Sequence, residues 1–407
     1  MPRNRKATVV ALISTAAILL GFWLIIRTIG QPTGKPLNTL APFGQQAQDI
    51  QNLTIPVFAV AGVIFVLVMV AVIWMVVRFR APDDAVEGEH EPAQTHGNTP
   101  LEIGWTIVPA VILAVLAVLN VQTLLRLDDT GENPLEVTVA GQQWWWEYRY
   151  DLDGDQTPEI VTATQMVMPA GRDVTVKIQS NDVIHSFWIP SLNGKKDAVP
   201  GRTHELVFNS DNPGIYEGQC TEFCGLSHGV MRMQVKVLPP AEYDVWIREM
   251  TKAPAQPTSA AASRGEALFV GQCARCHEVN GLTPDSTPPF TYSDEPSPDY
   301  GVEVDSSLSS KNAPNLTNFM MRQTFAGNLL ALWEGDAATA VVAVPGQVPG
   351  ATPDKVNIKR WLRNPQDVKP MDAENNQGMP NLNLSEDQID DLTEYLVTLG
   401  PSTRPAA

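Results

Sequence analysis

The chain has 407 residues, enough for two or three domains, and a formal net charge of −17. Such an acidic chain is not expected to bind nucleic acid, because phosphate recognition requires a basic face. Its four cysteines form two close pairs rather than a disulfide framework. Close pairs of this kind favour metal, haem or redox chemistry.

Three apolar runs lie near the N-terminus, at residues 7–26, 55–77 and 103–125. Each has about 20 residues, enough to cross the hydrocarbon layer of a membrane as a helix. The alternative, a buried core helix, is disfavoured because the runs carry almost no charge. Residues 1–30 have the pattern of a signal anchor or a cleaved signal sequence, and we favour the anchor because no small-x-small cleavage site follows. The other two runs predict a transmembrane hairpin within residues 31–130.

Basic residues orient these spans. Arg3, Arg5 and Lys6 precede the first run, and Arg78 and Arg80 follow the second. The positive-inside rule assigns both groups to the cytoplasm. The chain beyond the third run is therefore predicted to lie outside the cytoplasm, in an oxidising compartment where free thiols need a ligand or a covalent partner.

The outer part of the chain divides at a linker. Residues 131–250 contain short runs that alternate apolar and polar residues, at 135–139, 173–178 and 231–237, which predicts an antiparallel sandwich or barrel. Residues 251–262 are rich in Pro, Ala and Ser and lack an apolar pattern, as is typical of linkers.

The remainder, residues 263–403, is predicted to be helical. Ser263–Glu266 and Ser385–Gln388 both fit a capping box at the start of a helix. Residues 281–311 are polar, with several Pro and Asp, and are predicted to form a loop.

Residues 220–231 concentrate metal-binding side chains, in the sequence Cys-Thr-Glu-Phe-Cys-Gly-Leu-Ser-His-Gly-Val-Met. Glycines within it and a turn before it favour a loop between strands over a helix. Thiolate, imidazole and thioether ligands together favour copper. Zinc is the competitor, but its sites seldom use methionine. His185, in an apolar strand-like run, is the candidate for a further nitrogen ligand.

A second motif reads Cys273-Ala-Arg-Cys276-His277. Cys-x-x-Cys-His is the attachment sequence of c-type haem, in which two thiols bind the haem vinyl groups and the histidine binds the iron. A thioredoxin-like motif is the alternative, but it would need a βαβ context. A methionine is the expected sixth ligand. The candidates are Met320, Met321, Met371 and Met379.

The first motif, with His-Ser-Phe upstream, resembles subunit II of the haem–copper cytochrome c oxidases. The resemblance implies a cupredoxin-like fold with a dinuclear copper centre, CuA. The implied ligands are His185, Cys220, Glu222 (through its carbonyl), Cys224, His228 and Met231. Cys220 and Cys224 would bridge the two coppers, and the carboxylate of Glu222 would face a magnesium ion at subunit I. Quinol-oxidising relatives lack these copper ligands.

Two further stretches extend the resemblance. In Gly141–Tyr150 the first tryptophan, Trp144, corresponds to the place where electrons enter from cytochrome c. Trp145 and Trp146 are better explained as packing residues. Glu102, at the start of the third apolar run, corresponds to a glutamate where protons enter; the alternative is an ordinary interfacial carboxylate.

The C-terminal part resembles class I cytochrome c domains fused to oxidase subunits, in the segments 312–317 and 361–365. By that resemblance Met379, followed by a proline just before the last helix, would be the axial ligand, with Met371 as its rival. Pro314 would support His277.

Together these resemblances imply a caa-type oxidase subunit II, with transmembrane helices, an all-β cupredoxin-like barrel and an all-α cytochrome c domain. A cytochrome bc complex or a small cytochrome c would reduce haem c, and electrons would pass through CuA to haem a in subunit I. There oxygen would be reduced to water with proton translocation. We expect a multi-pass protein of the bacterial plasma membrane with both outer domains on the extracytoplasmic side. A free-standing electron carrier and a copper-delivery protein are the alternatives.

Overall fold

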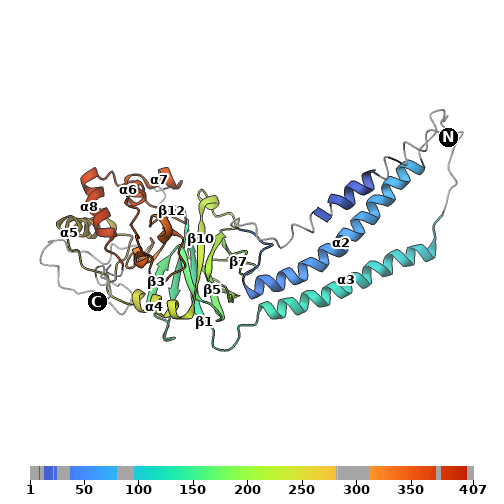
Figure 1. Ribbon diagram of the computed structural model, residues 1–407, viewed down its shortest axis with the longest axis horizontal. Coiled ribbons are helices and arrows are strands. Elements are labelled where there is room, and N and C mark those ends of the chain that lie inside the picture. The colour runs from blue at the N-terminus through green and yellow to red at the C-terminus, as the bar shows by residue number, and fades with distance from the viewer. Residues whose placement is uncertain are drawn as a thin grey trace. The chain divides into compact units, whose positions relative to one another are not determined.

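Figure 1 shows the computed structural model, which describes residues 9, 13–21, 23–24, 37–79, 96–280, 282, 312–372 and 377–400. The chain forms two compact units. One comprises Met1–Thr33 with Gln48–Leu127, and the other Gly34–Ala47 with Asp128–Ala407.

The first unit contains two long apolar helices, α2 (Gln45–Arg78, whose first turn belongs to the second unit) and α3 (Thr99–Leu127). Both are long and apolar enough to cross a membrane, and they contain the predicted spans 55–77 and 103–125. Arg126 lies 3.9 Å from Asp49, so the end of α3 meets the start of α2 as in an antiparallel hairpin.

Within the first apolar run, residues 9, 13–21 and 23–24 are helical. Its remaining residues fall outside the described part of the chain, as do Arg3, Arg5, Lys6 and Arg80. The predicted orientation of the spans therefore stays a prediction.

The second unit begins with a β domain, residues 135–250. Its strands are β1 (Leu135–Gln142), β2 (Trp145–Tyr150), β3 (Ile160–Ala163), β4 (Gln165–Pro169), β5 (Val174–Ser180), β6 (His185–Trp188), β7 (Lys195–Ala198), β8 (His204–Phe208), β9 (Gly214–Gln219) and β10 (Arg232–Leu238). They form a five-stranded sheet in the order β3-β2-β1-β5-β8, a three-stranded sheet β4-β10-β9 and the pair β6-β7. Helix α4 (Pro240–Met250) follows.

The three strands expected from alternation are confirmed in β1, β5 and β10, but the antiparallel expectation is only partly right. β1 pairs with β5 in parallel, and so does β4 with β10. Parallel neighbours need a long connection. Here that connection is made of other strands. The consecutive strands β1 and β2, β2 and β3, β6 and β7, and β9 and β10 do pair antiparallel, as expected.

Residues 37–47 also pack on the β domain. The Phe43 amide donates to the carbonyl of Ser191 at 2.8 Å, and the Ser210 hydroxyl donates to the carbonyl of Phe43 at 2.8 Å. Gly44 fits closely, because a Cβ there would lie 2.4 Å from the carbonyl oxygen of Leu192. The segment before α2 is thus part of the fold of the β domain.

The helical domain, residues 259–400, completes the second unit. Its α-helices are α5 (Ala260–Leu268), α6 (Lys355–Arg363), α7 (Pro365–Val368) and α8 (Glu386–Leu396). A π-helical turn, η2 (Phe269–Cys273), extends α5, and the short strands β11 (Thr324–Phe325) and β12 (Leu330–Ala331) pair. α5 packs tightly on α8, because a Cβ on Gly265 would lie only 2.0 Å from the carbonyl oxygen of Asp391.

One of the two predicted helix starts is confirmed. Ser385 and Gln388 form a capping box at the start of α8. The box predicted at Ser263 is wrong, since α5 begins at Ala260 and is capped by the Ser259 side chain. Alanine is the strongest helix former, so the three alanines before Ser263 extend the helix backwards into the predicted linker.

Three residues of the helical domain join the buried core of the β domain. Met321, Ala343 and Val344 of the helical domain belong to the apolar cluster of the β domain. Polar side chains also join the two domains, among them Gln323 to Gln165 at 3.2 Å. Contacts of this kind place the two outer domains against each other within one compact unit.

Candidate metal centre and haem cavity

Residues 220–231 form a loop between β9 and β10, as the glycines predicted. The loop is closed at its base, where the amide of Cys220 donates to the carbonyl of Met231 at 3.0 Å. Gly225 adopts a φ of +108°, and a Cβ there would lie 3.1 Å from Nε2 of Gln143. The conformation and the close packing both favour glycine at this position.

The sulfur and nitrogen side chains of this loop converge. Cys220 Sγ lies 3.8 Å from Cys224 Sγ. Cys224 Sγ in turn lies 3.6 Å from Nδ1 of His228 and 3.8 Å from Sδ of Met231. The carbonyl oxygen of Glu222 is 3.4 Å from Cys220 Sγ. All five predicted ligands from the loop therefore surround one small space.

His185 reaches the same space from the start of β6. Its donor atom and those of Cys220 and Cys224 all lie within 4.8 Å of one another. Nε2 of His185 is 2.7 Å from Oδ1 of Asp182, whereas the buried Nδ1 has no hydrogen-bond partner among the described residues. Asp182 thus holds the proton on Nε2 and leaves the Nδ1 lone pair for a metal.

The two thiols share one buried site. A hydrogen bond with Cys224 lowers the pKa of Cys220. The pKa of Cys224 is raised by that same bond, and further by burial. A second thiolate would otherwise lie beside the first in a buried loop, so both thiols ionise together only when a cation binds. The orphaned nitrogen and the paired thiols fit copper, a soft metal with N and S ligands.

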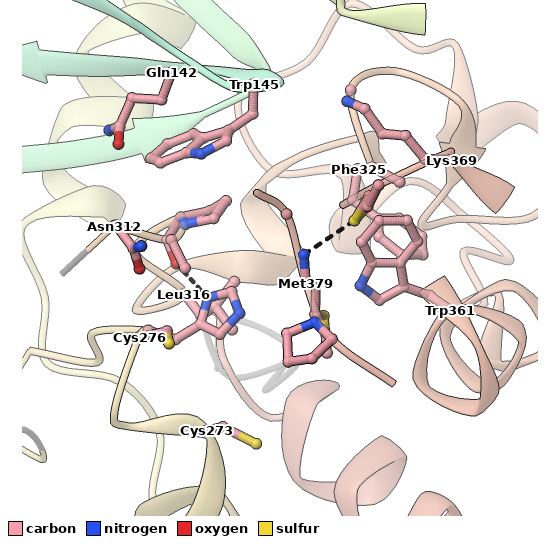
Figure 2. A pocket seen from close by; sticks show the side chains of 18 of the residues that line it. Gln142, Trp145, Cys273, Cys276, Asn312, Leu316, Phe325, Trp361, Lys369 and Met379 are labelled. Carbon is pink, nitrogen blue, oxygen red and sulfur yellow. Dashed lines mark hydrogen bonds between the residues drawn. The ribbon is translucent and has the colours of Figure 1, made fainter. Parts of the chain in front are cut away.

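A cavity of about 740 Å³ lies against the second motif. Figure 2 shows Cys273 and Cys276 on one side of it and Met379 across from them. Burial raises the pKa of Cys273 to about 12, so this thiol stays protonated. Nδ1 of His277 lies 2.8 Å from the carbonyl oxygen of Pro314, which confirms the expected support. That contact holds the proton on Nδ1 and leaves Nε2 free for an iron.

The four candidate methionines separate by position. Met371 and Met379 line the cavity, and Met320 and Met321 are not among its lining residues. Met379 packs against the core of the helical domain, whereas Met371 packs against the core of the β domain. The cavity, its two thiols and a facing methionine fit a covalently attached haem.

Trp144 lies between the metal loop and the cavity. Its side chain is buried and donates from Nε1 to the carbonyl of Cys224 at 2.9 Å. Gln143 donates to that same carbonyl at 2.7 Å. Trp144 and Trp145 both line the haem cavity, although they belong to the β domain (Figure 2 labels Trp145).

The packing role expected for Trp146 is confirmed, and Trp145 has a second role. Trp146 is fully buried, and its ring lies 5.2 Å from that of Phe187, in the core of the β domain. Trp145 forms part of the wall of the haem cavity. The packing prediction for Trp145 did not include this cavity.

Glu102 belongs to the other unit of the chain. It lies exposed in the first turn of α3, and its carboxylate accepts from the amide of Asn98 at 3.1 Å. Glu222 also has an exposed side chain. A role of either carboxylate toward a partner subunit stays a prediction.

Sequence reasoning missed two residues at these centres. Asp182 could have been predicted from the sequence. It lies three residues before His185, and a carboxylate near a metal-binding histidine often orients its ring. No pattern in the sequence indicates a role for Lys369, because only the packing of the two domains brings it to Trp144.

Three protein-family models match the chain. They are described as cytochrome C oxidase subunit II, transmembrane domain, over residues 42–123; cytochrome C oxidase subunit II, periplasmic domain, over residues 135–238; and cytochrome c, over residues 262–400. Cytochrome c oxidase subunit 2 of Alkalihalophilus pseudofirmus is 31% identical over 373 residues, which cover 89% of this chain and 91% of that protein. The chain belongs to the cytochrome c oxidase subunit II family.

Other similar proteins carry the same description. Cytochrome c oxidase subunit 2 of Bacillus subtilis is 30% identical, over 89% of this subunit II and 92% of that protein. The periplasmic domain of subunit II of cytochrome oxidase from Bradyrhizobium japonicum is 28% identical, with a TM-score of 0.27, and covers 30% of this chain and 95% of that one.

Membership confirms the family resemblance drawn from the two motifs. Subunit II is a membrane-bound part of the haem–copper oxidase complex, which also holds subunit I. Its cupredoxin-like β domain and its cytochrome c domain imply copper and haem binding.

Proposed function

We propose that this subunit II admits electrons to a caa-type terminal oxidase. Electrons would arrive at a covalent haem c and pass through CuA to haem a in subunit I, where oxygen is reduced to water with proton translocation. One observation carries the proposal: Trp144 lines the haem cavity and also donates a hydrogen bond to the backbone of Cys224. A single side chain thus touches both candidate centres.

The metal loop would hold the copper. Cys220 and Cys224 would hold two copper ions together with Nδ1 of His185 and Nδ1 of His228. Met231 and the carbonyl of Glu222 would complete the two shells. Such a centre supplies one-electron chemistry with little rearrangement of its ligands. The loop favours this because Cys220, Cys224 and Met231 are all at most 3% exposed and held by packing.

The cytochrome cavity would hold the haem. Cys273 and Cys276 would form thioether bonds to its vinyl groups, and Nε2 of His277 and Sδ of Met379 would bind the iron. Burial lowers the pKa of His277, which keeps the imidazole neutral and available as a ligand.

The partners follow from these roles. The donor to haem c would be a cytochrome bc complex or a small cytochrome c, reached on the extracytoplasmic side of a bacterial plasma membrane. Glu102 would take part in proton uptake with subunit I, and the carboxylate of Glu222 would contribute to a magnesium site at that subunit.

The test is a metal and electron inventory of the purified membrane complex. We expect about two coppers for each haem c, a delocalised mixed-valence electron-spin signal, and co-purification of a protein that contains haem a. After rapid reduction of haem c, the copper signal should bleach. One copper or one zinc for each haem c, or a haem c that never reduces the metal, would contradict the proposal.

A further inference from the structure

Lys369 lies at the junction of the two outer domains. It follows α7 of the helical domain and is 3% exposed. Its Nζ donates a hydrogen bond to the backbone carbonyl of Trp144 in the β domain. Its side chain also lines the haem cavity, as Figure 2 shows. This lysine therefore connects the haem cavity to the tryptophan that contacts the metal loop.

Neighbouring contacts hold the same junction. The hydroxyl of Ser227, in the metal loop, donates to the carbonyl of Pro370. Gly327, also of the helical domain, packs so closely that a Cβ there would lie 2.6 Å from Nζ of Lys369 and 3.1 Å from the carbonyl oxygen of Val230. Two segments of the helical domain thus contact both the Trp144 backbone and the metal loop.

Stability alone does not explain a lysine here. Among the described residues no carboxylate lies within ion-pair distance of Nζ. Burial lowers the pKa of Lys369 to about 7, and the nearby thiols of Cys224 and Cys220 offset only part of that effect. Burying an amine without a carboxylate partner costs free energy that a well-packed apolar side chain would avoid. Besides a positive charge near the two thiols, the amine adds a directed bond to one backbone atom, the carbonyl oxygen of Trp144.

We propose that Lys369 is a positioning residue for electron transfer from haem c to the copper centre. It fixes Trp144 between the two, through the bond from Lys369 Nζ to the Trp144 carbonyl and the bond from Trp144 Nε1 to the Cys224 carbonyl. In this step one electron leaves the reduced haem iron and arrives at the oxidised copper pair; no bond breaks and no proton moves. The inference rests on the proposed function.

The test uses the complete oxidase complex with Lys369→Met, Lys369→Arg and, as a matched control, Lys359→Met. Lys359 lies on α6 and pairs with Asp390 at 2.7 Å. Haem c is reduced by a light pulse, and the rate at which the copper signal bleaches is recorded. We expect Lys369→Met to slow this rate about tenfold, because small misplacements of reacting groups have large effects on rate. The control should stay close to the unmodified rate. The arginine variant should also slow the transfer, because its larger guanidinium does not fit the space beside Gly327. Every optical and electron-spin spectrum should stay unchanged.

A second variant tests the same idea without removing the amine. Gly327→Ala would push Nζ away from the Trp144 carbonyl and should slow the transfer as Lys369→Met does. Unmodified rates in both variants would overturn the proposal, and so would altered copper or haem spectra, which would assign Lys369 to site assembly. If the complex with Lys369→Met does not assemble, the transfer rate of the Gly327→Ala complex decides the test. Absence of transfer in the unmodified complex would instead overturn the proposed function itself.

Discussion

The amide nitrogen of Met379 donates a hydrogen bond to the sulfur of Met371 across 3.0 Å. The two rivals for the haem iron are therefore neighbours, and one of them supports the other. The sulfur of Met371 is occupied by this bond, and its side chain packs toward the β domain. Met379 packs in the helical core that surrounds the cavity.

Met379→Ala should therefore remove the sixth ligand of the haem, whereas Met371→Ala should leave it in place. Optical spectra of the Met379 variant should show a high-spin haem that binds carbon monoxide. The reverse outcome, with carbon monoxide binding only after Met371→Ala, would make Met371 the ligand.

Asp182→Ala should weaken copper binding, because the carboxylate at 2.7 Å fixes the proton on Nε2 of His185. Losing such a partner typically lowers metal affinity by about 10- to 100-fold. Competition with a copper chelator measures the change. Asp197→Ala, an exposed aspartate on β7, is the control, and equal affinity in the two variants would show that Asp182 does not orient the histidine.

Met231→Leu should alter the copper spectrum and leave the haem spectrum unchanged. Sδ of Met231 lies 3.8 Å from Cys224 Sγ, and leucine has nearly the same volume but no lone pair. The substitution should cost less than about 1.5 kcal/mol of stability. The electron-spin spectrum checks this, and an unchanged copper signal would remove Met231 from the ligand set.

Glu102→Gln should lower oxidase turnover by about 100-fold or more, as loss of a proton-transfer group typically does. Both metal spectra should remain those of the unmodified protein. Oxygen consumption by the purified complex is the measurement. Normal turnover would mean that Glu102 acts only as a helix cap, by accepting the hydrogen bond from the Asn98 amide.

Lys236→Met should flatten the pH dependence of stability. Lys236 on β10 is fully buried, its Nζ has no hydrogen-bond partner among the described residues, and burial lowers its pKa from 10.5 to about 7. Between these values the unfolded chain binds a proton that the native chain does not. Stability should therefore rise with pH in this window, by at most about 1.4 kcal/mol per pH unit.

Thermal unfolding at pH 7 and pH 9 checks this prediction. Lys195→Met, an exposed lysine on β7, should keep the slope of the unmodified chain. An equal slope in the Lys236 variant would mean that this amine is not the group that titrates.

The sequence alone determined the features that depend on short spacing. The loop ligands lie within twelve residues of one another, and the haem motif spans five. The predicted membrane spans depend only on apolar runs. The capping box at Ser385 depends on two residues three positions apart. Such patterns are local, so the residues that form each feature can be identified from their spacing in the sequence.

Only the tertiary structure determined which distant segments of the chain are in contact. Trp144 and Cys224 meet across 80 positions, and Lys369 reaches Trp144 across 225. The separation of Met379 from Met371 and the parallel pairing of β1 with β5 have the same origin. No local spacing encodes these contacts, because they exist only once each domain has folded and the two domains have packed against each other.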